Sequence, residues 1–178
     1  MESEVISTAG GGCGCSEDGC AECAESPWRP GTSYITTAFF GMPGLMGAYA
    51  LLRKAPLRLP VFAGIWVAIT TLVRKIVCCR CEYYGTDCST LMGRWTAMIY
   101  EKDEEHPLTA GAFYIDFALI GASILFPLPQ VRKMGARYLA LYALTVLVSS
   151  VAVKQLACSH CPIDVCFNNP GFKNRKRS

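Results

Sequence analysis

Four apolar segments, each about 20 residues long, constrain this chain of 178 residues more than any other feature. A helix of that length matches a hydrocarbon core roughly 30 Å thick. The segments are apolar on all sides, whereas the helices of a water-soluble bundle keep polar outer faces. Only 17% of the residues are charged, less than in an ordinary soluble domain. The sequence therefore predicts four membrane spans, at residues 34–52, 59–77, 108–128 and 138–157.

The connections between these segments predict their topology. Residues 53–58 join the first two spans, and the short basic turn Pro129–Arg137 joins the last two. Short links make neighbouring helices antiparallel, and helices of this length satisfy their own backbone polar groups in lipid. We therefore expect an all-α integral membrane protein, an up-down four-helix bundle that occupies residues 34–166.

The long connection at residues 78–107 contains a further helical pattern. Within Ser89–Tyr100 the apolar residues recur at helical spacing, and Ser89 is a candidate N-cap. Trp95 and Arg94 suit the depth of the membrane interface. The pattern predicts an amphipathic helix that lies in the interface between spans two and three.

Both tails are polar, and they differ in charge. Residues 1–33 are acidic and rich in Gly, Ser and Cys, without apolar periodicity or a secretory leader pattern, so we expect a disordered tail and no cleavable signal. Residues 167–178 are basic, which favours the cytoplasmic side of the cell membrane for this face. The expected partners are the lipid bilayer and a membrane or peripheral redox protein; nucleic acid is not expected.

All eleven cysteines fall outside the predicted spans. With four passes, residues 1–33, residues 78–107 and the segment after residue 157 share one side of the membrane. Cysteine used merely as a small apolar residue would also occur within the spans. The segregation therefore indicates thiol chemistry at one membrane face.

The spacing of the cysteines indicates what that chemistry is. The face carries three Cys-x-x-Cys pairs, at residues 20–23, 78–81 and 158–161. This spacing lets two sulfurs chelate one metal, and thiolates suit zinc, Cu(I) and iron–sulfur clusters. We expect the pairs after spans two and four to converge on a zinc or iron–sulfur site. The predicted site residues are Cys78, Cys81, Cys88, Cys158, Cys161 and Cys166, with Cys79, His160, Cys20 and Cys23 as further candidates.

Other uses of these thiols stay open, and so does the question whether the protein is an enzyme. The pairs also suit structural disulfides, thiol–disulfide exchange or lipidation. A four-span bundle with Cys-x-x-Cys resembles the layout of vitamin K epoxide reductases and disulfide-forming quinone reductases, which implies a quinone-coupled thiol oxidoreductase. The resemblance concerns architecture alone, because the cysteine order does not map onto those families. The adjacent Cys78 and Cys79 are similar to the vicinal pair of mercury transporters, which implies a heavy-metal transporter.

A polar layer is predicted inside the bundle, below the cysteines. Asp116 is an acidic residue deep in a span, and an ionisable group there is a functional candidate. Thr70 and Ser149 lie at similar depth on spans two and four. One interpretation is a site for a proton, an ion or a quinone head group. The other is a structural contact in which Asp116 pairs with Lys154.

Overall fold

The computed structural model describes residues 27–29, 31–86, 88–163 and 166, and within them the chain is helical and contains no strand. Four helical stretches are long and apolar enough to cross a membrane, which confirms the predicted apolar helices. They are Thr32–Lys54, Pro56–Val77, Ala110–Lys133 and Ala136–His160. Most of the two predicted tails lies outside the described residues.

Several of these stretches consist of more than one helix. In chain order the elements are α1 (Thr32–Lys54), η1 (Pro56–Arg58), α2 (Leu59–Thr70), α3 (Leu72–Val77), α4 (Met92–Ile99), α5 (Ala110–Leu125), α6 (Leu128–Lys133), α7 (Ala136–Leu156) and η2 (Cys158–His160). Thr71 separates α2 from α3, with φ −117° and ψ −72°. The second stretch is therefore interrupted about two helical turns before Cys78.

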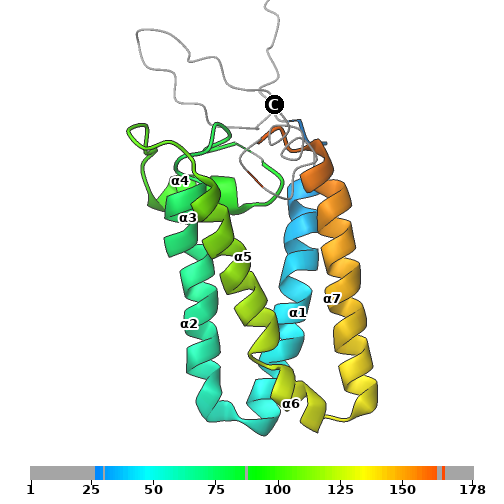
Figure 1. Ribbon diagram of the computed structural model, residues 1–178. Coiled ribbons are helices and arrows are strands. Elements are labelled where there is room, and N and C mark those ends of the chain that lie inside the picture. The colour runs from blue at the N-terminus through cyan, green and yellow to red at the C-terminus, as the bar shows by residue number, and fades with distance from the viewer. Residues whose placement is uncertain (1–26, 30, 87, 164–165, 167–178) are drawn as a thin grey trace, which may run out of the picture.

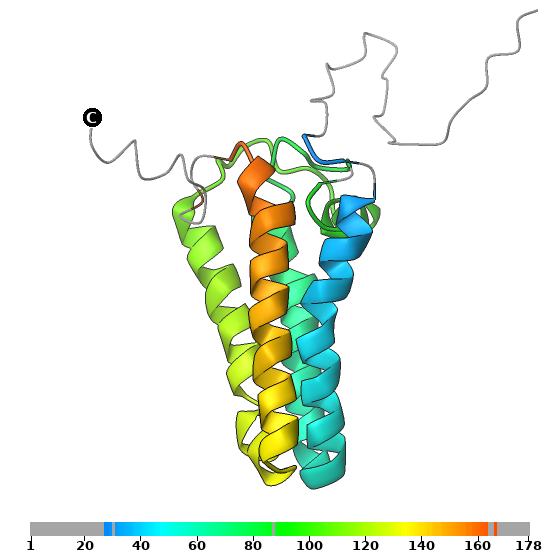
Figure 2. The same ribbon diagram turned by 90° about the vertical axis from the view of Figure 1, so that its right-hand side faces the viewer.

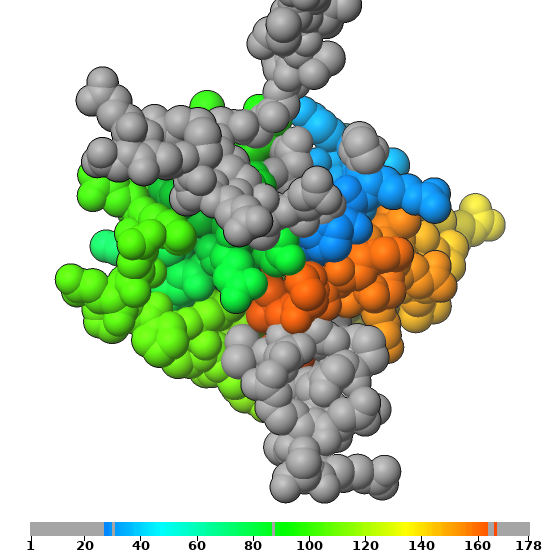
Figure 3. All heavy atoms as spheres, turned by 90° about the horizontal axis from the view of Figure 1, so that it is seen from above, coloured from blue at the N-terminus to red at the C-terminus, as the bar shows by residue number. Residues whose placement is uncertain are grey.

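The long helices lie side by side, and their connections gather at two opposite ends of the bundle (Figures 1 and 2). η1 and α6 lie at one end. The other end carries α4, the segment that follows α3, and η2, and the described cysteines belong to these segments or lie close to them in sequence. Figure 3 looks onto this second end, where chain from the green, blue and orange parts of the sequence meets.

The outside of the spans is apolar, while part of their interior is polar. Leu45, Leu125 and Leu147 are exposed on three different helices, whereas Thr36 and Ser149 are buried. In a water-soluble bundle, leucines are mostly buried and hydroxyl residues are mostly exposed. The surface of these helices therefore suits contact with a lipid bilayer.

Two glycines of α1 allow other elements to approach closely. A Cβ atom at Gly44 would lie 2.2 Å from the Trp66 ring, and one at Gly47 would lie 2.7 Å from Pro127. Gly41, one turn earlier, has no such neighbour within 4 Å. Gly44 and Gly47 are thus needed for the packing of α1, in the way that small residues serve other membrane bundles.

The predicted turn at Pro129–Arg137 is wrong in part, because α6 occupies most of it. Pro127 and Pro129 fall at the start of this helix, where a missing N–H breaks no hydrogen bond and the fixed φ is already helical. Val131 is completely buried, so α6 closes this end of the bundle. The turn itself is short and uses Gly135, whose φ is 106°.

The helix predicted at Ser89–Tyr100 is present but starts later, and Ser89 is not its N-cap. The Ser89 carbonyl instead accepts a hydrogen bond from the Thr36 hydroxyl. The Leu91 N–H donates to Thr37 Oγ1 at 3.1 Å. The start of α4 is therefore held by side chains of α1 rather than by its own sequence, a tertiary contact that local capping rules do not reveal.

Candidate thiol site

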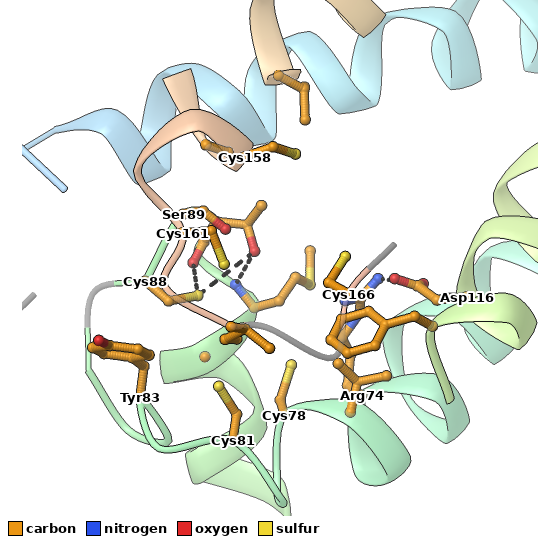
Figure 4. Close-up of a pocket in the computed structure, with 18 of the residues that line it drawn as sticks. Arg74, Cys78, Cys81, Tyr83, Cys88, Ser89, Asp116, Cys158, Cys161 and Cys166 are labelled. Carbon is orange, nitrogen blue, oxygen red and sulfur yellow. Dashed lines mark hydrogen bonds and ion pairs between the residues drawn. The ribbon is translucent and has the colours of Figure 1, made fainter. Parts of the chain in front are cut away.

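Cysteine side chains from separate parts of the chain line one cavity of about 230 Å³ at the second end of the bundle. The cavity, which we call the thiol cavity, is bordered by residues of α1, α3, α5 and α7 and by the loop before α4. Figure 4 shows how its cysteines are arranged. They are the six residues named from the sequence, Cys78, Cys81, Cys88, Cys158, Cys161 and Cys166.

The two Cys-x-x-Cys segments of the cavity adopt the same local turn. The Cys81 N–H donates to the Cys78 carbonyl at 3.2 Å, and the Cys161 N–H donates to the Cys158 carbonyl at 3.3 Å. Each turn directly follows a long stretch of helix. In Figure 4, Cys78 and Cys81 lie on one side of the cavity and Cys161 on the other. Two similar turns at two helix ends thus present their sulfurs to one space.

Burial keeps these thiols neutral. Desolvation raises the pKa of Cys78 and of Cys161, and it raises the pKa of Cys81 to about 12. Neighbouring thiols add smaller increases: Cys88 and Cys161 both raise the pKa of Cys81. These sulfurs are therefore near enough for the charge on one to affect another. At neutral pH the buried thiols are protonated.

Cys88 packs closely against α4 at Gly93. Its Sγ donates a hydrogen bond to the Thr90 carbonyl at 3.1 Å. A Cβ atom at Gly93 would lie 3.2 Å from this sulfur and 2.9 Å from the Thr86 carbonyl oxygen. Any larger residue at position 93 would therefore push Cys88 or the adjoining loop away from α4.

Trp28, which the sequence reasoning does not single out, borders the thiol cavity from the N-terminal segment. Its indole N–H donates to the Ala157 carbonyl at 2.9 Å, beside Cys158. Its ring meets Tyr83 edge-on, with 5.3 Å between the ring centroids. The sequence signal that could have identified Trp28 is its place between a polar tail and an apolar segment. A tryptophan there tends to bury its apolar ring and to donate its indole N–H to one polar partner.

The remaining candidate ligands lie elsewhere. Cys79 is buried, but it is not among the described residues that line the thiol cavity. Its carbonyl accepts a hydrogen bond from the Asp103 N–H at 2.9 Å. His160 is exposed on η2. Cys20 and Cys23 lie outside the described residues.

Among the residues that the structure describes, no three His, Cys, Asp or Glu side chains are already grouped to hold a metal ion. The thiols are distributed around the wall of the cavity instead (Figure 4). Coordination of one metal by several of them therefore requires their side chains to rotate. The zinc or iron–sulfur site stays a prediction.

An ion pair lines the part of the thiol cavity that lies within the spans. Arg74 of α3 and Asp116 of α5 meet at 2.9 Å, and each side chain is only 12% exposed. The Arg74 Nε–H also donates to the Ile69 carbonyl at 3.1 Å. The sequence suggested Lys154 as the partner of Asp116, but the structure pairs this residue with Arg74, because α3 packs against α5. The charges compensate each other within the protein.

The other predicted polar residues do not share this cavity. Thr70 donates its hydroxyl to the Trp66 carbonyl of its own helix at 2.9 Å. Ser149 is buried in a second cavity of about 330 Å³, which residues of α1, α2, α5 and α7 line and which we call the bundle cavity. The two cavities share four apolar lining residues, Phe40, Phe117, Ile120 and Val153. Similar depth has therefore not brought Asp116, Thr70 and Ser149 to one site.

Comparison with known proteins assigns no family, since no protein-family model, curated protein or solved structure matches the chain significantly. The residues around the two cavities are therefore the basis on which a function can be proposed.

Proposed function

We propose that the four apolar stretches cross the cell membrane as an up-down bundle. Their apolar outer surface and the gathering of their connections at opposite ends support this arrangement. In it α4 lies in the interface, since Trp95 and Met98 are exposed while Gly93 and Thr96 are buried. The end with the thiol cavity faces the cytoplasm, which the basic residues at 167–178 favour.

We further propose that the thiol cavity binds a thiophilic metal, as zinc or as an iron–sulfur cluster. One observation carries this proposal: the cysteine pairs that follow two different spans line the same cavity. Two such pairs are a common source of four sulfur ligands. The proposed ligands are Cys78, Cys81, Cys158 and Cys161, with Cys88 and Cys166 in the same cavity.

The surroundings suit a metal that deprotonates its own ligands. Burial raises the pKa values of the Cys78 and Cys81 thiols, so these groups are neutral without metal. A soft cation stabilises thiolates, so binding releases protons and its affinity increases with pH. The carboxylate of Asp116 is already paired with Arg74. Sulfur is thus the donor that the cavity offers.

Metal analysis and absorption spectroscopy of anaerobically purified protein test this function. We expect stoichiometric zinc, or iron with the absorption of a cluster, and we expect its loss in C78S. The matched control is C79S: the two cysteines are adjacent and both are buried, yet only Cys78 is among the described lining residues. Metal-free protein, or equal loss of metal in both variants, contradicts the proposal.

Thiol–disulfide exchange is a second candidate, which the gathering of several thiols in one cavity favours. Cys78 and Cys88 form no disulfide. Burial is the main cause of the raised pKa of Cys78, and the nearby Cys88 adds a smaller increase. A bond between these two sulfurs releases two protons and two electrons, which a quinone or a partner disulfide takes up. Loss of two thiols per chain on addition of such an oxidant, in metal-free protein, supports this candidate over the first.

A further inference from the structure

The bundle cavity contains two buried polar groups for which the described protein supplies no partner. The indole Nε1 of Trp66 and the hydroxyl of Ser149 make no hydrogen bond, and both atoms are buried. The Ser149 residue as a whole is only 6% exposed. An unpaired donor is costly in a low-dielectric interior. Both groups therefore point to a molecule that occupies the cavity.

Ser149 differs from two hydroxyl residues near it on α7 and from one on α2. On the same helix, Thr145 and Ser150 donate to carbonyls one turn earlier, at 2.8 Å and 2.7 Å. On α2, Thr70 makes the same kind of bond. Such a bond satisfies a hydroxyl within its own helix. Ser149 does not make it, so its buried hydroxyl has no hydrogen-bond partner among the described residues.

The indole of Trp66 is held in a fixed position. Gly44 leaves the space that the ring occupies, since a Cβ atom there would lie 2.2 Å from it. Phe40 and Phe62 pack edge-on against the ring, with centroids 5.5 Å and 6.4 Å away. A ring held on these sides presents its N–H in one direction. This donor is therefore preorganised, which lowers the entropic cost of binding.

The lining of the cavity defines the class of ligand. Phe39, Phe40 and Phe117 contribute aromatic walls, and all four long helices take part. The cavity lies within the spans, so its ligand comes from the membrane. Its volume of about 330 Å³ is near the lower end of the range for small-molecule pockets. Ser150 and Lys154 also line it. An acyl chain offers these donors no acceptor, whereas a flat ring with two carbonyl oxygens offers two.

We propose that the bundle cavity binds the head group of a membrane quinone. The Trp66 N–H and the Ser149 hydroxyl each donate to one quinone carbonyl. Helices α5 and α7 both line the cavity and make few contacts with each other, so the ligand enters from the lipid between them. The ring then lies one layer of side chains away from the thiol cavity. This site does not depend on whether the thiols hold a metal.

The test is a titration of the full chain in nanodiscs with decylubiquinone, whose fully substituted ring does not add to thiols. Retention by loaded nanodiscs over empty ones measures binding. We expect saturable binding of one quinone per chain, weakened about three- to tenfold in S149A and in W66F, since each variant loses one hydrogen bond. The matched control T145A, which loses a hydroxyl one turn away on α7 and outside the cavity, keeps its affinity.

Further variants separate this proposal from a folding defect and from the metal site. V146F fills the bundle cavity and abolishes binding, while its thermal unfolding stays close to that of the parent chain. C78S binds quinone normally, even where it has lost metal. The proposal is overturned by absence of saturable binding, by unchanged affinity in both S149A and W66F, or by extraction of phospholipid alone from a cavity that refuses quinone.

Discussion

The thiol cavity and the bundle cavity share a wall of four apolar side chains, but they are lined in different ways. At the end of the bundle, several segments leave their helices and meet, so that cysteines from distant parts of the sequence gather beside the ion pair of Arg74 and Asp116. Between the helices, backbone polar groups are already paired, and side chains supply the only donors. The difference teaches that a site at the end of the bundle is built from many donors, whereas one between the helices offers few without a partner, here Trp66 and Ser149.

The largest effect is expected at the ion pair that borders the thiol cavity. D116L leaves Arg74 buried without its partner, and removal of one member of a buried pair costs about 3–5 kcal/mol. We expect the free energy of unfolding in detergent to fall by about 3 kcal/mol. The double variant R74M/D116L regains most of this loss, because no charge then stays buried. Equal losses in the single and double variants would rule out the ion pair as the cause.

A smaller effect, confined to the bundle cavity, is expected at Gly44. The Cβ atom of G44A collides with the Trp66 ring, and overpacking of this kind costs about 1–3 kcal/mol. The indole must move, so decylubiquinone binding weakens while metal content stays the same. The matched control is G41A, one turn earlier on α1, where a Cβ atom meets nothing within 4 Å. Loss of metal in G44A would mean that the two cavities are not independent.

The converse effect is expected at Gly93, on the side of the thiol cavity. G93A brings a Cβ atom to 2.9 Å from the Thr86 carbonyl oxygen and 3.2 Å from Cys88 Sγ, which we expect to cost about 1 kcal/mol. Cys88 is displaced, so metal content falls while quinone affinity is unchanged. G121A, which meets nothing within 4 Å on α5, serves as the control. Metal content is measured in parallel with the quinone titration.

The smallest effect concerns the rate of a reaction rather than stability. The pKa of Cys81 is raised by burial to about 12 from an ordinary value of 9.0, and alkylation requires the thiolate. In metal-free protein its alkylation at pH 8 is therefore slower than in unfolded protein. The rate continues to increase with pH above pH 9, where an ordinary thiol levels off. Mass spectrometry of the peptide that contains Cys81 measures the rate, and a plateau near pH 9 would contradict the burial of this thiol.

Hydropathy identified the four apolar helices because each one is apolar along its full length, which a sequence pattern shows directly. It did not identify α6, because Pro127 and Pro129 resemble turn residues although they fall where a helix tolerates them. Capping rules misplaced the start of α4, which Thr37 of α1 holds from outside the segment. Patterns within one segment could be predicted, whereas the contacts that α4 and α6 make with other segments could not.

The same limit explains the result at the candidate site. Depth along a helix can be read from sequence, but rotation about its axis cannot, so Arg74 and Lys154 were equally available to Asp116. Cys78 and Cys79 are adjacent in the turn that follows α3, and only Cys78 is among the described lining residues. The convergence of the six cysteines was expected from their parity, because an even number of passes returns the chain to the same face. Nothing in the sequence marked Trp66 as a site residue, because only the packed structure shows that its N–H has no hydrogen-bond partner among the described residues.

Trp28 has a consequence for the two ends of the described chain. Its hydrogen bond to the Ala157 carbonyl joins residues that are 129 positions apart in the sequence, and it lies beside Cys158. The segment before α1 and the segment after α7 are therefore fastened to each other at the edge of the thiol cavity, so that the first and the last long helix cannot separate at this end without breaking the bond.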